Sequence, residues 1–160
     1  MSGRIDQQSG KKLIPGCIIW VNIRLQLRKK LCRGREMKTV LLTDDNPDIV
    51  ELVQLILANS GYNLVVASDG VEAVDTCLAQ TPDLVLMDLK MPNMDGLAAT
   101  QSLRDKGFSN PIVILTASES ADDRLEAERA GCDGYIVKTL EMKEVESTLD
   151  KFLHAGGEKL

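Results

Sequence analysis

The sequence predicts an α/β fold, a doubly wound five-stranded parallel sheet with helices on both faces. Five short apolar runs recur between residues 37 and 160, and each is continuous rather than alternating, as is typical of strands buried on both faces. Their starts lie 24, 20, 28 and 23 residues apart, so each gap has room for one crossover helix and two short loops. Right-handed crossovers then place helices on both faces of the sheet.

The predicted strands are the apolar runs themselves, at residues 40–42, 64–67, 84–87, 112–115 and 135–137. Each segment that follows a strand carries apolar residues at helical spacing. Proline suits the first turn of the first helix, and glycine or proline ends the first, second and fourth helices. The fourth has a thin apolar face. The helices are predicted from Pro47 to a stop at Gly61, from Val71 to a stop at Pro82, from Leu97 to Lys106, from Glu119 to Ala130, and over Met142–Phe152.

The net charge of −5 conceals two different pieces. Residues 1–36 hold nine basic and two acidic residues (net +7), whereas residues 37–160 hold 10 basic and 22 acidic residues (net −12), which marks a boundary. The acidic piece would repel a phosphate backbone, so we expect no nucleic-acid partner. No apolar run approaches the roughly 18 residues of a membrane span, so we expect no membrane partner. The four scattered cysteines favour reduced thiols in the cytoplasm over a zinc site or a disulfide scaffold.

Polar residues follow the predicted strands where the chemistry of an open α/β sheet is expected. Ligands bind beyond the carboxyl ends of such strands, near the point where strand order reverses. Each aspartate alone is more often a helix cap or turn residue, and the lysine alone is more often a surface residue. Together, clustered carboxylates need a cation, and their oxygen ligands suggest Mg²⁺. A hydroxyl and a lysine nearby would suit a phosphoryl group. These residues are Asp44, Asp45, Asp88, Thr116 and Lys138.

Four segments, in this order and at this spacing, resemble the receiver domain of two-component response regulators, in particular a chemotaxis-type regulator. The most specific is Asp88 followed by Met91-Pro92 and Met94-Asp95-Gly96. The resemblance implies a flavodoxin-like (βα)₅ fold with strand order 2-1-3-4-5, and it covers residues 37–155. The four segments are Val40–Asn46, Leu84–Gly96, Ile112–Ala117 and Gly131–Lys138.

The resemblance also implies a role for each site residue. Asp88 would accept a phosphoryl group from a phosphohistidine, on a histidine kinase or a histidine phosphotransfer protein. Mg²⁺ would be held by Asp45, Asp88 and the backbone carbonyl of Lys90, with Asp44 acting through water. The phosphate oxygens would be bound by Thr116, Ala117 and Lys138.

Tyr135 matches the aromatic switch position of the family. When Thr116 moves toward the phosphate, Tyr135 would turn inward, which repacks the face made by the fourth helix, the fifth strand and the fifth helix for a downstream protein target. One position departs from the family pattern, since Lys138 is followed by Thr139 rather than by a proline with a cis bond. A cis bond before a residue other than proline costs about 2.5–4 kcal/mol, so Thr139 favours trans. The family pattern therefore does not fix the pose of Lys138 or the shape of the loop into the fifth helix, whereas the phosphoacceptor is unaffected.

The remaining expectations concern the ends of the chain. Residues 1–36 are expected to be a basic extension, either disordered or a basic amphipathic segment, or else a leader that precedes a true start at Met37. Residues 156–160 would be a short tail. The domain would then be a single-domain receiver, acting either by binding a target or as a phosphorelay carrier, with no enzymatic activity beyond its own phosphorylation and dephosphorylation.

Two alternatives to a phosphoacceptor module stay open. A haloacid-dehalogenase-type enzyme also uses an aspartate nucleophile with Mg²⁺, but it carries the nucleophile in an Asp-x-Asp motif after its first strand, where this chain has Asp44-Asp45-Asn46. A phosphorylation-independent pseudo-receiver, serving only to bind protein, is opposed by the retained Asp45, Asp88, Thr116 and Lys138. Phosphorylation of Asp88 discriminates among the three.

Overall fold

The computed structural model describes residues 37–58, 60–138 and 143–154. The chain divides into two units, residues 1–36 and 37–160, and the described residues all belong to the second. The expected basic extension, the tail at residues 156–160 and Thr139 lie outside the described residues. No helix in the described part of the chain is long and apolar enough to cross a bilayer.

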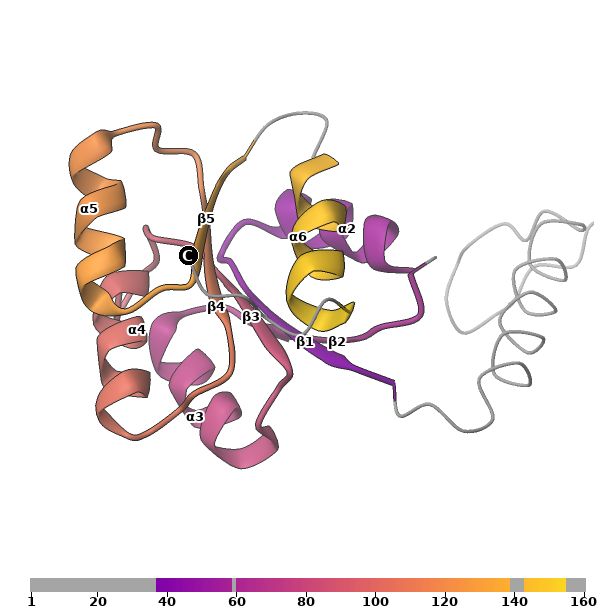
Figure 1. Cartoon of the computed structure of the whole chain (residues 1–160), viewed down its shortest axis with the longest axis horizontal. Helices are drawn as coiled ribbons and strands as arrows, with labels where there is room; N and C mark the ends of the chain where they lie inside the picture. The colour runs from indigo at the N-terminus through magenta and orange to yellow at the C-terminus, as the bar shows by residue number, and fades with distance from the viewer. Residues whose placement is uncertain (1–36, 59, 139–142, 155–160) are drawn as a thin grey trace, which may run out of the picture. The chain divides into compact units, whose positions relative to one another are not determined.

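Five strands form one parallel sheet in the order β2-β1-β3-β4-β5, so the predicted fold and strand order are confirmed (Figure 1). In register, Thr43 at the end of β1 pairs with Met87 at the end of β3. The residues that follow these two strands therefore emerge side by side at one edge of the sheet. The strands are β1 (Thr39–Thr43), β2 (Asn63–Ala67), β3 (Leu84–Met87), β4 (Ile112–Thr116) and β5 (Gly134–Val137).

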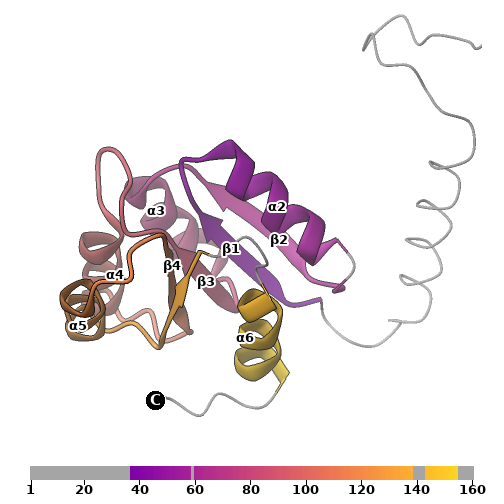
Figure 2. The ribbon, with the colours of Figure 1, turned by 90° about the horizontal axis from the view of Figure 1, so that it is seen from above.

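Five helices cover the two faces of the sheet, as the continuous apolar strands predicted. Helices α2 and α6 lie on one face, whereas α3, α4 and α5 lie side by side on the other (Figures 1 and 2). Strand residues alternate between the two cores, so Leu41 packs toward α3 and α4 while Leu42 packs toward α2 and α6. The helices are α2 (Pro47–Leu57), α3 (Gly70–Gln80), α4 (Gly96–Asp105), α5 (Ala121–Ala130) and α6 (Lys143–His154).

Side-chain caps explain where the helices begin. Asn46, Asp69, Asp95 and Ser120 precede α2, α3, α4 and α5, and each accepts a hydrogen bond from a backbone N–H in the first turn. The fourth helix begins at Ala121, two residues after the predicted start at Glu119, because Ser120 is its cap. Helix α2 ends at Leu57, ahead of the glycine expected to stop it.

Helix α5 buries few of its side chains. Only Ala127 and Ala130 of its ten residues are buried, and Leu125 is 45% exposed. The thin apolar face predicted from the sequence is thus confirmed.

Candidate functional site

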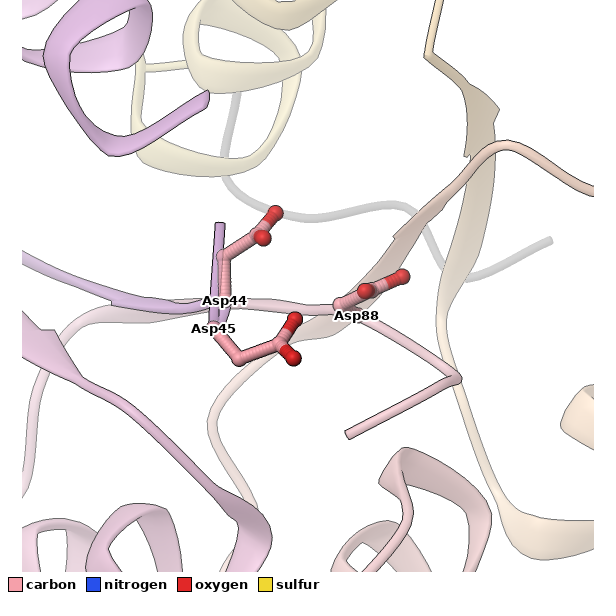
Figure 3. A group of neighbouring side chains, drawn as sticks. All are labelled: Asp44, Asp45 and Asp88. Carbon is pink, nitrogen blue, oxygen red and sulfur yellow. The ribbon is translucent and has the colours of Figure 1, made fainter. Parts of the chain in front are cut away.

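Three carboxylates meet at the carboxyl edge of the sheet (Figure 3). Asp44 and Asp45 follow β1, Asp88 follows β3, and one carboxylate oxygen from each lies within 4.8 Å of the other two. The backbone N–H of Asp88 donates to the carbonyl of Thr43 at 2.9 Å, which continues the strand pairing up to the site. Asp44 and Asp88 are buried, with 2% and 7% of their surface exposed, whereas Asp45 is exposed. The structure therefore brings together the acidic residues predicted from the sequence.

Lys138 reaches this cluster from the end of β5. Its ammonium nitrogen lies 2.7 Å from Asp44 Oδ2 and 3.1 Å from Asp88 Oδ2. Its backbone N–H donates to the carbonyl of Thr116 at 2.7 Å, which holds the lysine beside the end of β4. The lysine thus reaches the two buried carboxylates with Thr139 as its neighbour in the sequence. Three carboxylates and one ammonium leave a formal charge of −2, which suits a divalent cation bound by oxygen ligands.

The surroundings of Asp88 pull its pKa in two directions, and the net shift is upward. Burial makes the largest contribution and raises the pKa, and the neighbouring carboxylate of Asp44 raises it further. The ammonium of Lys138 and the N–H of Leu89, which donates to Asp88 Oδ1 at 2.8 Å, lower it. A cation added beside Asp88 would favour its charged form. The Asp88 carboxylate is thus partly desolvated, and its charge depends on its cationic neighbours.

Thr116 and Tyr135, the two predicted switch residues, are connected through the loop that follows β4. Thr116 is buried, and its hydroxyl accepts a hydrogen bond from the N–H of Ser118 at 3.3 Å. The hydroxyl of Tyr135 donates to the carbonyl of the same Ser118 at 2.9 Å. Burial raises the pKa of Tyr135, and Asp123 adds to that shift, so the phenol stays protonated and able to donate. A movement of Ser118 would therefore change a hydrogen bond of Thr116 and a hydrogen bond of Tyr135.

The first turn of α5 adds two contacts that the sequence analysis did not predict. The hydroxyl of Ser118 contacts the carboxylate of Asp123, and the guanidinium of Arg124 lies over the ring of Tyr135, 5.6 Å from its centroid. Ser120 caps α5, so Asp123 and Arg124 lie in its first turn. No signal in the sequence indicates that this turn faces Tyr135.

Ala117 and Lys90 lie on exposed loops, after β4 and β3 respectively. Lys90 lines a surface groove of about 400 Å³ between its own loop and α5. The other residues that line this groove are Leu89, Met91, Asp95, Leu97 and Asp123.

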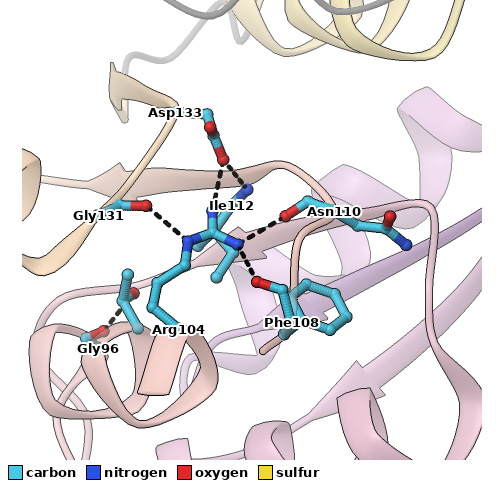
Figure 4. A network of polar contacts seen from close by, with 8 residues as sticks. Gly96, Arg104, Phe108, Asn110, Ile112, Gly131 and Asp133 are labelled. Carbon is cyan, nitrogen blue, oxygen red and sulfur yellow. Dashed lines mark hydrogen bonds and ion pairs between the residues drawn. The ribbon is translucent and has the colours of Figure 1, made fainter. Parts of the chain in front are cut away.

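A second polar network lies away from the cluster and joins α4 to β4 and β5 (Figure 4). Arg104 pairs with Asp133 at 2.5 Å, and the same carboxylate oxygen accepts from the N–H of Ile112 at 2.9 Å. The side chains of the pair are 20% and 8% exposed. The guanidinium also donates to three backbone carbonyls, those of Phe108 (2.7 Å), Asn110 (3.0 Å) and Gly131 (2.8 Å). This network contains none of the predicted site residues, and it fixes the loops at the opposite end of the strands.

Comparisons of the sequence and of the structure with known proteins point to the same family. Residues 40–150 match the model of the response regulator receiver domain. The chain is 35% identical over 119 residues to a probable transcriptional regulatory protein, TcrX of Mycobacterium tuberculosis, covering 74% of this chain and 51% of that protein. The chain spans about half the length of the curated relatives it matches.

Solved structures of response regulators superpose on the same region. A two-component response regulator of the LuxR family from Aurantimonas matches with a TM-score of 0.70 and 30% identity, over 78% of this chain and 90% of that chain. The response regulator TrrA of Thermotoga maritima, in complex with Mg²⁺-BeF, matches with a TM-score of 0.66 and 33% identity, over 72% of this chain and 99% of that chain. With the parallel fold, the acidic cluster and the lysine beside it, these matches show that the chain belongs to the receiver domain family of two-component response regulators.

Proposed function

We propose that Asp88 accepts a phosphoryl group from the phosphohistidine of a histidine kinase or a histidine phosphotransfer protein. The observation that carries the proposal is the contact of the buried Asp88 carboxylate with Lys138, at the edge where Asp44 and Asp45 also lie. A carboxylate in this position is both a nucleophile and one of several charges that can stabilise a phosphoryl group.

The transfer is a substitution at phosphorus. A carboxylate oxygen of Asp88 attacks the phosphorus, the bond from phosphorus to the imidazole nitrogen breaks, and the electron pair of that bond leaves with the imidazole. The product is an acyl phosphate on Asp88 and a histidine on the partner. Signalling of this kind needs no further catalytic activity from the domain than its own phosphorylation and dephosphorylation.

The residues suited to hold Mg²⁺ are Asp44, Asp45, Asp88 and the backbone carbonyl of Lys90. The three carboxylates fit a hard divalent cation, because their oxygens lie within 4.8 Å of one another and one ammonium leaves them a formal charge of −2. The Mg²⁺ in the TrrA complex supports this choice. Bound there, Mg²⁺ would offset the negative charge of the phosphoryl oxygens.

Three further groups would bind the phosphate oxygens once Asp88 carries them. Lys138 already contacts Asp88, so its ammonium can move from the carboxylate to the phosphoryl group at little cost. Thr116 is the last residue of β4, the strand next to β3 in the sheet, and Ala117 follows it directly. The hydroxyl of Thr116 and the backbone N–H of Ala117 are the donors at this strand end. Each would donate one hydrogen bond.

Movement of Thr116 toward the phosphate would change the packing of Tyr135. Both residues contact Ser118, so a shift of this loop alters the partners of the phenol. The repacked surface would be the one formed by α5, β5 and α6, which a downstream protein target would recognise. The expectation of a single-domain regulator stays a prediction, because the curated relatives extend well beyond the matched region.

The test is phosphorylation of the full chain by a small phosphoryl donor in the presence of Mg²⁺, followed by intact mass. We expect a gain of one phosphoryl group that is lost in Asp88→Asn and kept in Asp75→Asn, a matched exposed aspartate on α3. Equal gain in both variants would refute Asp88 as the acceptor. No gain in the wild type, either from this donor or from phosphohistidine on a histidine phosphotransfer protein, would favour the alternative, a phosphorylation-independent binding module.

A further inference from the structure

The loop between β3 and α4 is hydrogen-bonded to the start of α3, through residues that lie 24 positions apart in the chain. The side-chain amide of Asn93 donates to Asp69 Oδ2 at 2.6 Å. Beside it, the backbone N–H of Gly70 donates to the carbonyl of Met94 at 3.1 Å. Two adjacent hydrogen bonds therefore hold the loop residues 93 and 94 against the start of α3.

The residues at this junction are suited to the close contact. A Cβ on Gly70 would lie 2.5 Å from the carbonyl oxygen of Met94, so only glycine allows this approach. Asn93 has φ of 62°, in the left-handed region that asparagine tolerates better than most residues. Asp69 uses both of its oxygens, since Oδ1 caps α3 by accepting from the N–H of Glu72 at 2.8 Å. This cap and the amide of Asn93, in that order, lower the pKa of Asp69, so the carboxylate stays charged.

The two ends of the same loop, Leu89 and Gly96, are joined by a hydrogen bond beside Asp88. The N–H of Gly96 donates to the carbonyl of Leu89 at 3.0 Å, and a Cβ on Gly96 would lie 2.0 Å from the carbonyl oxygen of Asp88. Lys90 lies between Leu89 and the residues tied to α3. Its backbone carbonyl cannot be repositioned by a side-chain rotation, because only the path of the loop determines where that oxygen lies.

We infer that Asp69 and Asn93 form a clamp that positions the carbonyl of Lys90 for the divalent cation. They are positioning residues, because they act through the loop backbone and belong to neither the carboxylate cluster nor the phosphate-binding groups. The inference rests on the proposed function, in which that carbonyl is one of the ligands of Mg²⁺.

The test measures Mg²⁺ affinity in variants that break the clamp and keep the local backbone. Asp69→Ser retains a helix cap but cannot reach Asn93, and Asn93→Gly removes the amide but permits the positive φ. Asp95→Ser is the matched control, since Asp95 caps α4 in the same way, accepting from the N–H of Ala98 at 2.8 Å. The dissociation constant for Mg²⁺ is measured on the full chain by NMR titration, and amide exchange at Gly70 reports on the clamp without metal.

We expect Mg²⁺ to bind roughly three- to tenfold more weakly in Asp69→Ser and in Asn93→Gly, the range set by the net contribution of one hydrogen bond. The double variant should be no weaker than the weaker single variant, because both remove the same bond. Asp95→Ser should bind as the wild type does. Asp69→Asn should recover most of the affinity, since an amide can still cap α3 and can donate to Asn93 once the side chain of Asn93 is flipped.

Wild-type affinity in both single variants, with faster exchange at Gly70, would overturn the inference and leave the proposed function intact. Unchanged exchange at Gly70 would also overturn it, because the clamp would not hold the loop. A wild-type chain that fails to bind Mg²⁺ would overturn the metal site of the proposed function together with the clamp, and this result is read from the wild type alone.

Discussion

Replacing Arg104 by methionine should strongly destabilise the fold. The change keeps an unbranched apolar stem of similar length and removes the guanidinium, which makes one ion pair and three hydrogen bonds to backbone carbonyls. Removing one partner of a buried pair costs about 3–5 kcal/mol, and the partial exposure of Arg104 favours the lower end of that range. Four hydrogen bonds at about 1 kcal/mol net each give a similar figure. We therefore expect a loss of about 3–4 kcal/mol in the free energy of unfolding.

The assay is equilibrium urea unfolding of the full chain, followed by far-ultraviolet circular dichroism. Arg124→Met is the control, because Arg124 forms an exposed pair with Glu128 at 3.7 Å and should lose about 1 kcal/mol or less. In the Arg104→Met background, Asp133→Ala should cost less than it costs alone, since it removes a carboxylate left buried without its partner. A loss in Arg104→Met no larger than that in Arg124→Met would refute the reasoning.

Three further predictions concern a buried hydroxyl, a buried thiol and an ion pair. Thr43→Val should raise the free energy of unfolding in urea by about 1 kcal/mol, because the buried hydroxyl has no hydrogen-bond partner among the described residues; a decrease would contradict this. Burial raises the pKa of Cys77 to about 12, so peptide mapping after thiol labelling at pH 8 should show Cys77 unmodified in the folded chain and labelled in urea. Equal labelling in both states would count against it. Burial tends to raise the pKa of Asp83, but the N–H of Thr39 and the ammonium of Lys38 outweigh it, and the net pKa is lowered. The stability that Asp83 contributes is therefore present above the pKa of the unfolded state and is lost as the pH falls through the lower pKa of the folded state. In Asp83→Asn the urea midpoint should fall less on acidification than it does in the wild type. An unaltered pH profile would refute this.

The sequence predicts much of the fold because its strands are buried on both faces and its helices are capped by short polar side chains. Asp44, Asp45 and Asp88 could be placed together, since they follow strands whose carboxyl ends share one edge. The pose of Lys138 does not follow from the sequence, because Thr139 stands where the family has proline; in the structure its ammonium contacts both Asp44 and Asp88. The polar contacts between distant segments could not be predicted. The bond from Asn93 to Asp69 depends on the path of one loop, and the position of Arg124 over Tyr135 depends on the rotation of α5 about its axis, which a thin apolar face does not fix.

The small number of buried side chains on α5 has a consequence for how related proteins diverge. Only Ala127 and Ala130 of this helix are buried, so most of its side chains lie at the surface. Substitutions at these outer positions cost little stability, so they can accumulate without damage to the sheet or to the acidic cluster. Descendants of one ancestral domain can in this way acquire different recognition surfaces while the chemistry stays the same. Sequence variation across orthologues is therefore expected to be greatest on the outer face of α5 and least at the carboxyl ends of β1 and β3.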